Sequence, residues 1–306
     1  MRIVLHGQQA FGQAVLEKLL DRGEDVVAVC CAPSKEGRPE DPLALFAKEK
    51  GLPLHQPGSW KTPEALKLMK SFESDVCMMA YVLMFVPQEV RDAPKYGTFQ
   101  YHPSLCPVHR GPSSINWPIA MGKSRTGLSI FWPNDGLDEG PMMLQKTCEI
   151  GPNETLGDIY FKKLFPMGVD AMLEGLDLVK AGVIIKHDQR LEDGSYESWF
   201  GKNEAKIDWS KPVSDVYNTI RAANPAPGAW TTVNGSELKV YDSALVEGNG
   251  AFGEVVSIDN IGVTVQGNGG RILIKRVRPE GGGKITASEW AANAEVNPGT
   301  KLGSKL

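Results

Sequence analysis

The sequence predicts an α/β protein in which a doubly wound, mainly parallel, Rossmann-like sheet is followed by a small OB-like β-barrel domain. Two observations support this prediction. Residues 1 to about 150 alternate short apolar runs with segments of helical periodicity, which is typical of a parallel sheet covered by helices. The last hundred residues hold closely spaced apolar runs separated by glycine and asparagine turns, which favours a small barrel.

The elements of the first part follow from the period of the apolar residues. We expect strands at 2–5, 25–31, 75–81, 97–101 and 126–131, alternating with helices at 8–23, 41–50, 62–72 and 87–92. A long helical pattern covers 153–182. In sheets of this kind, ligands bind beyond the carboxyl ends of the strands.

The domain boundaries are expected where the composition changes. Residues 1–182 form the predicted catalytic domain, and the polar, turn-rich stretch 183–204 reads as a linker. Residues 205–306 form the predicted barrel domain. In it we expect a helix at 211–222 and strands at 239–246, 253–258, 262–265 and 271–278.

Length and composition exclude several classes of protein. The 306 residues suggest about two domains, and the net charge of −4 with 23 % charged residues is ordinary for a globular chain. The longest nearly apolar run, residues 76–87, is shorter than the roughly 20 residues that cross a bilayer. The N-terminal MRIVLHGQQAFG soon turns polar, unlike a secretory signal. We therefore expect a cytoplasmic protein without a membrane partner.

The cysteine and histidine patterns predict neither disulfides nor a metal site. Five cysteines and five histidines show no CxxC or HExxH spacing, so reduced thiols are expected. His102, Cys106 and His109 are close in sequence, but no partner cluster accompanies them. The first loop, residues 6–12, lacks the middle glycine of a dinucleotide fingerprint, and we predict no NAD.

Two loops carry the candidate chemistry. Residues 101–111 directly follow a predicted strand, which puts His102 at the carboxyl edge of the sheet. Residues 132–141 follow another strand and concentrate acidic groups among turn residues. A histidine and an aspartate at adjacent strand ends could form an acid–base pair. A lone histidine is more often a structural residue, and acidic groups in a turn are often solvated, so spacing alone does not show that the two loops meet.

The two loops together resemble those of a known family. HPSLCPVHRG at residues 102–111, followed by GLDEG at 136–140, is similar to the motifs of folate-dependent formyltransferases and hydrolases. That family includes the methionyl-tRNA formyltransferases and the N-terminal hydrolase domain of the 10-formyltetrahydrofolate dehydrogenases. KIDWSKP and IRAANPAPGAW resemble the start of the family's C-terminal domain. The resemblance implies 10-formyltetrahydrofolate as formyl donor and tetrahydrofolate as product, without metal or nicotinamide cofactor.

The resemblance also implies the site residues. His102 and Asp138 match the catalytic pair, and Gln100 stands where the transferases have an asparagine. Glutamine keeps an amide donor on a longer arm, so we expect Gln100 to polarise the formyl oxygen. Cys106 replaces a customary leucine and is expected to pack rather than react. The expected folate-binding residues are Met84, Phe85, Val86, Ser104, Leu105, Cys106, Pro107, Arg110 and Asp138.

Some segments indicate a branch of the family. Residues 31–43 are nearly neutral and shorter than the basic insertion of the tRNA formyltransferases, whereas 129–132 and 164–168 resemble the dehydrogenase's hydrolase domain. We therefore expect the formyl group of 10-formyltetrahydrofolate to pass to water or a small amine. The alternatives are a methionyl-tRNA formyltransferase and a folate-binding module without activity. The nearly balanced charge of 201–306 gives nucleic acid no support, so tRNA is not the expected partner.

Overall fold

A computed structural model describes residues 1–303 of the chain. The described residues divide into two compact units that are discontinuous in sequence. The first unit contains Met1–Gly111, Gly127–Cys148 and Lys163–Tyr196, and the second contains Pro112–Thr126, Glu149–Lys162 and the residues from Glu197 on. The expected domain boundaries at 182 and 205 stay predictions, and the last three residues of the expected barrel domain, 304–306, lie outside the described residues.

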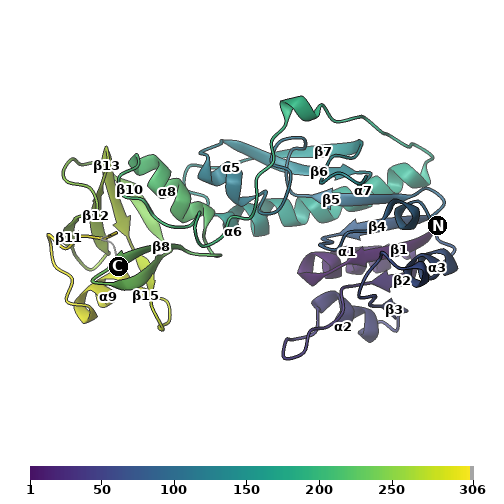
Figure 1. The fold of residues 1–306 in the computed structure, drawn as a ribbon, viewed down its shortest axis with the longest axis horizontal. Coiled ribbons are helices and arrows are strands. Elements are labelled where there is room, and N and C mark those ends of the chain that lie inside the picture. Colours follow the sequence, from purple (N-terminus) through teal and green to yellow (C-terminus); the bar gives the residue numbers. More distant parts are fainter. Residues whose placement is uncertain (304–306) are drawn as a thin grey trace. The chain divides into compact units, whose positions relative to one another are not determined.

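A seven-stranded sheet is the centre of the first unit. Its strands lie side by side in Figure 1. Its order is β3 (Leu54–His55), β2 (Asp25–Cys30), β1 (Arg2–Gly7), β4 (Val76–Ala80), β5 (Thr98–His102), β6 (Arg125–Phe131) and β7 (Met142–Glu149). The strands from β3 to β5 pair in parallel, and β6 is antiparallel to β5. The expected mainly parallel sheet is therefore confirmed. Strand β7 was missed because consecutive polar residues, such as Gln145 and Lys146, interrupt its apolar pattern.

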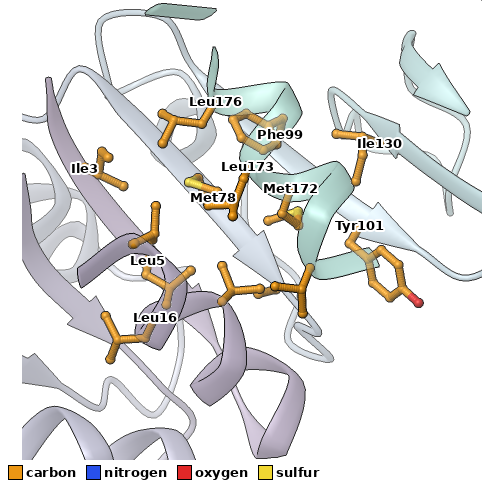
Figure 2. Packing of buried hydrophobic residues seen from close by; sticks show 14 of the residues in the cluster. Ile3, Leu5, Leu16, Met78, Phe99, Tyr101, Ile130, Met172, Leu173 and Leu176 are labelled. Carbon is orange, nitrogen blue, oxygen red and sulfur yellow. The ribbon is translucent and has the colours of Figure 1, made fainter. Parts of the chain in front are cut away.

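Helices cover both faces of this sheet, which makes it doubly wound. On one face, α1 (Gln9–Asp21) and α7 (Phe165–Lys180) pack on apolar side chains of β1, β4, β5 and β6. Figure 2 shows this cluster, with Leu16 of α1 and Met172 of α7 facing strand residues such as Met78. On the other face, α3 (Pro63–Ser71) and α4 (Gln88–Arg91) cover a second cluster that includes Met79.

Local sequence explains why these elements begin where they do. Strand β4 reads VCMMA and is buried along its whole length, as expected for a central parallel strand. The side chain of Thr62 accepts a hydrogen bond from the amide of Ala65 at the start of α3, and Pro63 occupies the first turn. Asp41 does the same for the amide of Leu43 in α2 (Pro42–Glu49). Because these caps satisfy free amides, each helix starts at a defined residue.

The single helix expected over 153–182 is interrupted. The chain forms α6 (Leu156–Ile159), a π-helical turn (Tyr160–Leu164) and then α7. Pro166 lies in the first turn of α7 and has no amide hydrogen to continue an α-helical ladder from the preceding residues. The helical period of the apolar residues continues through this break, so periodicity alone could not reveal it.

The second unit contains two four-stranded antiparallel sheets, which confirm the expected small β domain. One sheet has the order β10 (Ser243–Val246), β13 (Gly270–Ile274), β12 (Val263–Gly267) and β11 (Val255–Ile258). The other has the order β15 (Ile285–Thr286), β14 (Arg276–Pro279), β9 (Ser236–Val240) and β8 (Ala229–Val233). The remaining helices of this unit are α5 (Asn116–Ala120), α8 (Val213–Ala222) and α9 (Ala287–Asn293).

Two strands expected to be continuous each divide between the two sheets. The predicted strand 239–246 becomes the end of β9 and all of β10, and 271–278 becomes β13 and β14. At the corner, the amides of Lys275 and Arg276 both donate to the carbonyl of Asp242, and the amide of Tyr241 donates to Arg276. The segments β9–β10 and β13–β14 therefore pass from one sheet to the other side by side. This bend leaves the alternation of apolar residues unchanged. Among the described residues, no helix is long and apolar enough to cross a membrane.

Candidate active site

A pocket of about 270 Å³ lies on the face of the large sheet that carries α4. Its floor is a row of three side chains from adjacent strands. Met79 of β4 is in register with Gln100 of β5, and Gln100 is in register with Phe131 of β6. Residues directly opposite in register share one face of a sheet, so this row follows from the strand pairing.

Two loops form the walls of the pocket. Residues 82–86 follow β4, and residues 133–138 follow β6. The guanidinium of Arg91, which is 5 % exposed, joins the two walls. It donates to the carbonyl of Val86 at 2.6 Å and to the carboxylate of Asp135 at 2.7 Å. The pocket is therefore held by an internal cross-link of charge-assisted hydrogen bonds.

His102 and Asp138 lie together at this site. The Nδ1 atom of His102 is 3.6 Å from Oδ2 of Asp138, and the two residues are 7 % and 8 % exposed. His102 follows Gln100 by two positions on β5, so both side chains are on the pocket face of the sheet. Asp138 and Gln100 line the pocket. His102 does not line the pocket itself, but it contacts Asp138, which does.

The route by which Asp138 reaches His102 differs from the expected meeting of adjacent strand ends. Because β6 is antiparallel to β5, its carboxyl end lies beside Gln100, while His102 is opposite Ser129. The loop after β6 must therefore turn back along the face of the sheet. It closes where the amide of Trp132 donates to the carbonyl of Pro141, with Gly140 so close that a Cβ would lie 1.8 Å from the carbonyl oxygen of Trp132. Only glycine fits at this position.

Hydrogen bonds fix both members of the pair. The amide of Gly111 donates to Oδ2 of Asp138 at 2.9 Å. The Nε2 atom of His102 lies 3.2 Å from the backbone carbonyl of His109. A carbonyl only accepts, so the hydrogen-bond network assigns a proton to Nε2, which donates to His109. The nitrogen left to gain or lose a proton is Nδ1, which faces Asp138. This arrangement can move a proton between a buried imidazole and a carboxylate at the pocket wall.

The structure brings some of the expected folate-binding residues to the pocket and leaves others outside its lining. Met84, Phe85, Val86 and Asp138 line it. Ser104 is fully buried and donates to the carbonyl of Val108, and Cys106 is 4 % exposed. The remaining three residues, Leu105, Pro107 and Arg110, also lie outside the lining. A role in folate binding stays a prediction for all of these residues.

Cys106 and Arg110 have other partners. Burial raises the pKa of the Cys106 thiol to about 11, so the group stays protonated and is a poor nucleophile at neutral pH. Its amide donates to the hydroxyl of Ser129, which fits a packing role. Arg110 forms an ion pair with Glu139, the neighbour of Asp138. This pair ties the loop that follows His102 to the loop that carries Asp138.

Three contributors to the site were missed from the sequence. Arg91 and Asp135 join the pocket walls, and Gln189 of the expected linker donates to the carbonyls of Asp138 and Gly140. The only sequence signal for Arg91 was a charged residue in a predicted short helix. The structure shows that this residue is buried. Gln189 gave none, because polar residues in a turn-rich stretch read as solvated. Within residues 1–303, no group of three or more His, Cys, Asp or Glu side chains could hold a metal ion.

Comparison with known proteins identifies the family of the chain. The family model described as "Formyl transferase" matches residues 1–173, and "Formyl transferase, C-terminal domain" matches 200–295. The chain is 35 % identical over 97 % of its length to the mitochondrial 10-formyltetrahydrofolate dehydrogenase of Mus musculus, but it spans only about a third (34 %) of that relative's length. It is 34 % identical to the methionyl-tRNA formyltransferase of Geotalea daltonii, with 100 % of this chain and 99 % of that protein covered.

Solved structures share the fold. HypX from Aquifex aeolicus, crystallised with tetrahydrofolic acid, aligns with a TM-score of 0.69 and 19 % identity over 96 % of this chain and 47 % of its own. The sugar 3N-formyl transferase WlaRD, crystallised with dTDP and 5-N-formyl-THF, aligns with a TM-score of 0.69 and 18 % identity over 90 % and 97 % of the two chains. With matched models over both of its parts and a full-length relative at 34 % identity, the chain is an enzyme of the formyl transferase family.

Proposed function

We propose that this enzyme removes the formyl group of 10-formyltetrahydrofolate, passing it to water or a small amine and releasing tetrahydrofolate. One observation carries the proposal. Asp138 lines the pocket together with Gln100 and also faces Nδ1 of the buried His102, so an acid–base pair and an amide donor share one site. A folate ligand in this pocket is supported by the tetrahydrofolate and formyl-THF bound to the structural relatives HypX and WlaRD.

The first step is addition to the formyl carbon. Asp138 accepts a proton from the attacking water while the new carbon–oxygen bond forms. Asp138 passes this proton to Nδ1 of His102, and the carbonyl oxygen becomes an oxyanion that receives a hydrogen bond from the amide of Gln100. Because the carbonyl of His109 holds Nε2, Nδ1 is the nitrogen available for this transfer.

The second step is collapse of the tetrahedral intermediate. The carbon–oxygen double bond re-forms and the bond between the carbon and N10 breaks, as N10 takes the proton that returns from Nδ1 of His102 through Asp138. The products are tetrahydrofolate and formic acid, or a formamide where an amine replaces water. Both catalytic groups end in their starting protonation states, so one site can turn over repeatedly.

The choice of water or a small amine rests on residues 31–43. This segment carries both signs of charge, so it does not form the positive surface that phosphate binding requires; its charged residues include Lys35, Glu36, Arg38 and Glu40.

The direct test supplies purified protein with 10-formyltetrahydrofolate and with glycine, ammonia or no acceptor. Formate release without an acceptor assigns a hydrolase. Formation of a formamide only when an amine is present assigns a transferase to small amines.

A methionyl-tRNA formyltransferase is the second candidate, and one surface of the second unit favours it. Register places Arg278 of β14 opposite Lys239 of β9, and Lys239 opposite Trp230 of β8. Lys202 and Lys206 lie over the Trp230 ring, with Nζ 5.0 and 5.3 Å from its centroid. The sequence did not reveal this surface, because its cations lie far apart in the chain and meet only across the sheet.

The opposite side of the same sheet is apolar and buried, at residues such as Leu238, Val240 and Val277. The exposed side therefore carries several cations around an aromatic ring, a combination that suits a nucleic-acid backbone, although Glu237 on the same side pairs with Lys202. Filter binding of initiator tRNA over a salt series tests this candidate with the wild type and the variant Lys239→Glu/Arg278→Glu. Tight, salt-dependent binding that the double variant loses, together with formylated methionyl-tRNA as product, would favour the tRNA enzyme.

A further inference from the structure

We propose that Gln189 and Ser195 are positioning residues for the His102–Asp138 pair, an inference that rests on the proposed function of that pair. Both residues belong to residues 185–196, here called the strap, in the stretch that the sequence predicts as a linker. The strap forms hydrogen bonds with both loops that carry the chemistry. It therefore holds the geometry of the active site as well as connecting two parts of the chain.

The strap is attached to the acidic loop around Asp138. The amide nitrogen Nε2 of Gln189 donates to the carbonyls of Asp138, at 3.0 Å, and Gly140, at 2.7 Å. Backbone hydrogen bonds in both directions join His187 to Met142 at the end of this loop. The indole of Trp132, where the loop begins, donates to the carbonyl of Ile185 at 2.8 Å. The strap thus spans the loop from its first residue to its last.

The strap is also attached to the loop that follows His102. The amide of Ser195 donates to the carbonyl of Pro107, and the carbonyl of Ser195 accepts from the amide of Arg110. The hydroxyl of Ser195 accepts from the amide of His109 at 2.9 Å. His109 is the residue whose carbonyl lies 3.2 Å from Nε2 of His102. A chain of two contacts therefore leads from Ser195 to the catalytic imidazole.

Asp138 needs such support because its backbone is in the left-handed region, with φ +55°. This conformation is unfavourable for a residue with a side chain and persists only where the surroundings hold it. Gln189 donates hydrogen bonds to the carbonyls of Asp138 and Gly140, on either side of Glu139, and so fixes the turn that contains Asp138.

Hydrogen bonding rather than packing sets the position of the strap. Lys186, His187, Asp188 and Arg190 are all exposed. The Oε1 atom of Gln189 is buried without a hydrogen-bond partner, so Nε2 alone provides the attachment of its amide. Gly194 lies so close to the other loop that a Cβ would be 2.5 Å from the carbonyl oxygen of Pro107. Hydrogen bonds at Ile185, His187, Gln189 and Ser195 thus determine where the strap lies.

The test compares Gln189→Ala, Gln189→Glu, Ser195→Ala and Ser195→Thr with Asp188→Ala, an exposed change on the same strap. Gln189→Glu replaces the donor by an oxygen that faces two carbonyls, and Ser195→Thr retains the hydroxyl. For both Gln189 variants we expect kcat to fall about 10- to 100-fold with KM for the folate within about threefold, because the catalytic groups shift while the pocket loop 82–86 is untouched. Ser195→Ala should lose about 2- to 10-fold in kcat, the equivalent of one hydrogen bond, and Ser195→Thr should restore it.

A second measurement needs no substrate. A pH titration of the His102 ring nitrogens by ¹⁵N NMR reports the surroundings of the imidazole directly. The titratable or charged groups near it are Asp138, the Arg110–Glu139 pair, His109 and Cys106. Movement of Asp138 away from Nδ1 weakens the stabilisation of the imidazolium, so the midpoint for His102 should fall in Gln189→Ala and stay at the wild-type value in Asp188→Ala.

The two measurements separate the outcomes. The positioning role would be overturned if the Gln189 variants kept both the wild-type kcat and the wild-type midpoint of the His102 titration. A rise in KM without a change in kcat would also overturn it. A shifted midpoint in a protein that does not turn over 10-formyltetrahydrofolate would uphold the strap and reject the proposed function instead. If Gln189→Ala does not fold, the Ser195→Ala and Ser195→Thr pair decides, since loss and rescue of kcat support the proposal and equal kcat in both contradicts it.

Discussion

The Nδ1 atom of His102 lies 3.6 Å from Oδ2 of Asp138, although His102 ends β5 and Asp138 lies in the loop after the antiparallel strand β6. The contact exists because the loop after β6 folds back over the pocket face and is closed by Gly140. It places a carboxylate between a buried imidazole and the pocket. Predictions for this site therefore distinguish residues that handle protons from residues that shape the pocket.

Asp138→Asn should remove proton transfer while leaving the fold intact. The amide oxygen of asparagine still accepts from Gly111, but the side chain has no carboxylate to take a proton from the nucleophile. We expect kcat to fall about 100- to 10,000-fold, the usual contribution of general acid–base catalysis, with folate affinity within a few-fold of the wild type. Steady-state kinetics and isothermal titration with tetrahydrofolate measure the two effects. Near-full activity in this variant would show that the pair is wrongly assigned.

Gln100→Leu tests the expected oxyanion donor. The side chain keeps its volume and apolar contacts in the floor of the pocket but loses the amide. Removal of one such donor lowers kcat by about 100- to 1,000-fold. Gln100→Asn keeps a donor on a shorter arm, and we expect an intermediate rate. If both variants turned over at the wild-type rate, Gln100 would only pack the floor.

Arg91→Met tests the cross-link between the pocket walls. Loss of the buried guanidinium leaves the carbonyl of Val86 without its charged donor, and we expect the free energy of unfolding to fall by about 1–3 kcal/mol. KM for the folate should rise because residues 82–86 are no longer held. Asp135→Asn is the matched control. Its side chain is 67 % exposed, so the change should cost less than about 1 kcal/mol. Equal losses in the two variants, measured by urea unfolding, would contradict this account.

His6 should make the protein sensitive to acid. Burial lowers the pKa of His6 from 6.5 to about 3, and its Nε2 accepts from the indole of Trp60. In the unfolded chain the imidazole binds a proton near pH 6.5, so the unfolded state binds more protons as the pH drops below that value. The contribution of His6 to stability is complete above pH 6.5 and is lost progressively toward pH 3.

Urea unfolding of the wild type and His6→Gln between pH 7 and pH 4 measures this effect. We expect the stability of the wild type to decline more steeply than that of His6→Gln. His187→Gln, which changes an exposed histidine, should decline in parallel with the wild type. Parallel curves for the wild type and His6→Gln would mean that His6 is not the acid-sensitive group.

The sequence predicted the elements whose period is regular and missed what depends on contacts across the fold. The parallel strands β1, β2, β4 and β5, the helices between them and the two loops around His102 and Asp138 could be predicted because each has a local signal. The parallel strand β3 has only two residues and gave no such signal. The break before Pro166 and the division of 239–246 between two sheets leave the apolar period unchanged. Gln189 could not be found because its role comes from carbonyls about fifty residues earlier in the chain.

The most direct measurement is multiple turnover of 10-formyltetrahydrofolate by the purified enzyme, followed through tetrahydrofolate release with no acceptor and with small amines added in turn. We expect steady release in water or with a small amine, and loss of that release in both His102→Ala and Asp138→Ala. Release that requires methionyl-tRNA, or release that continues in either variant, would contradict it.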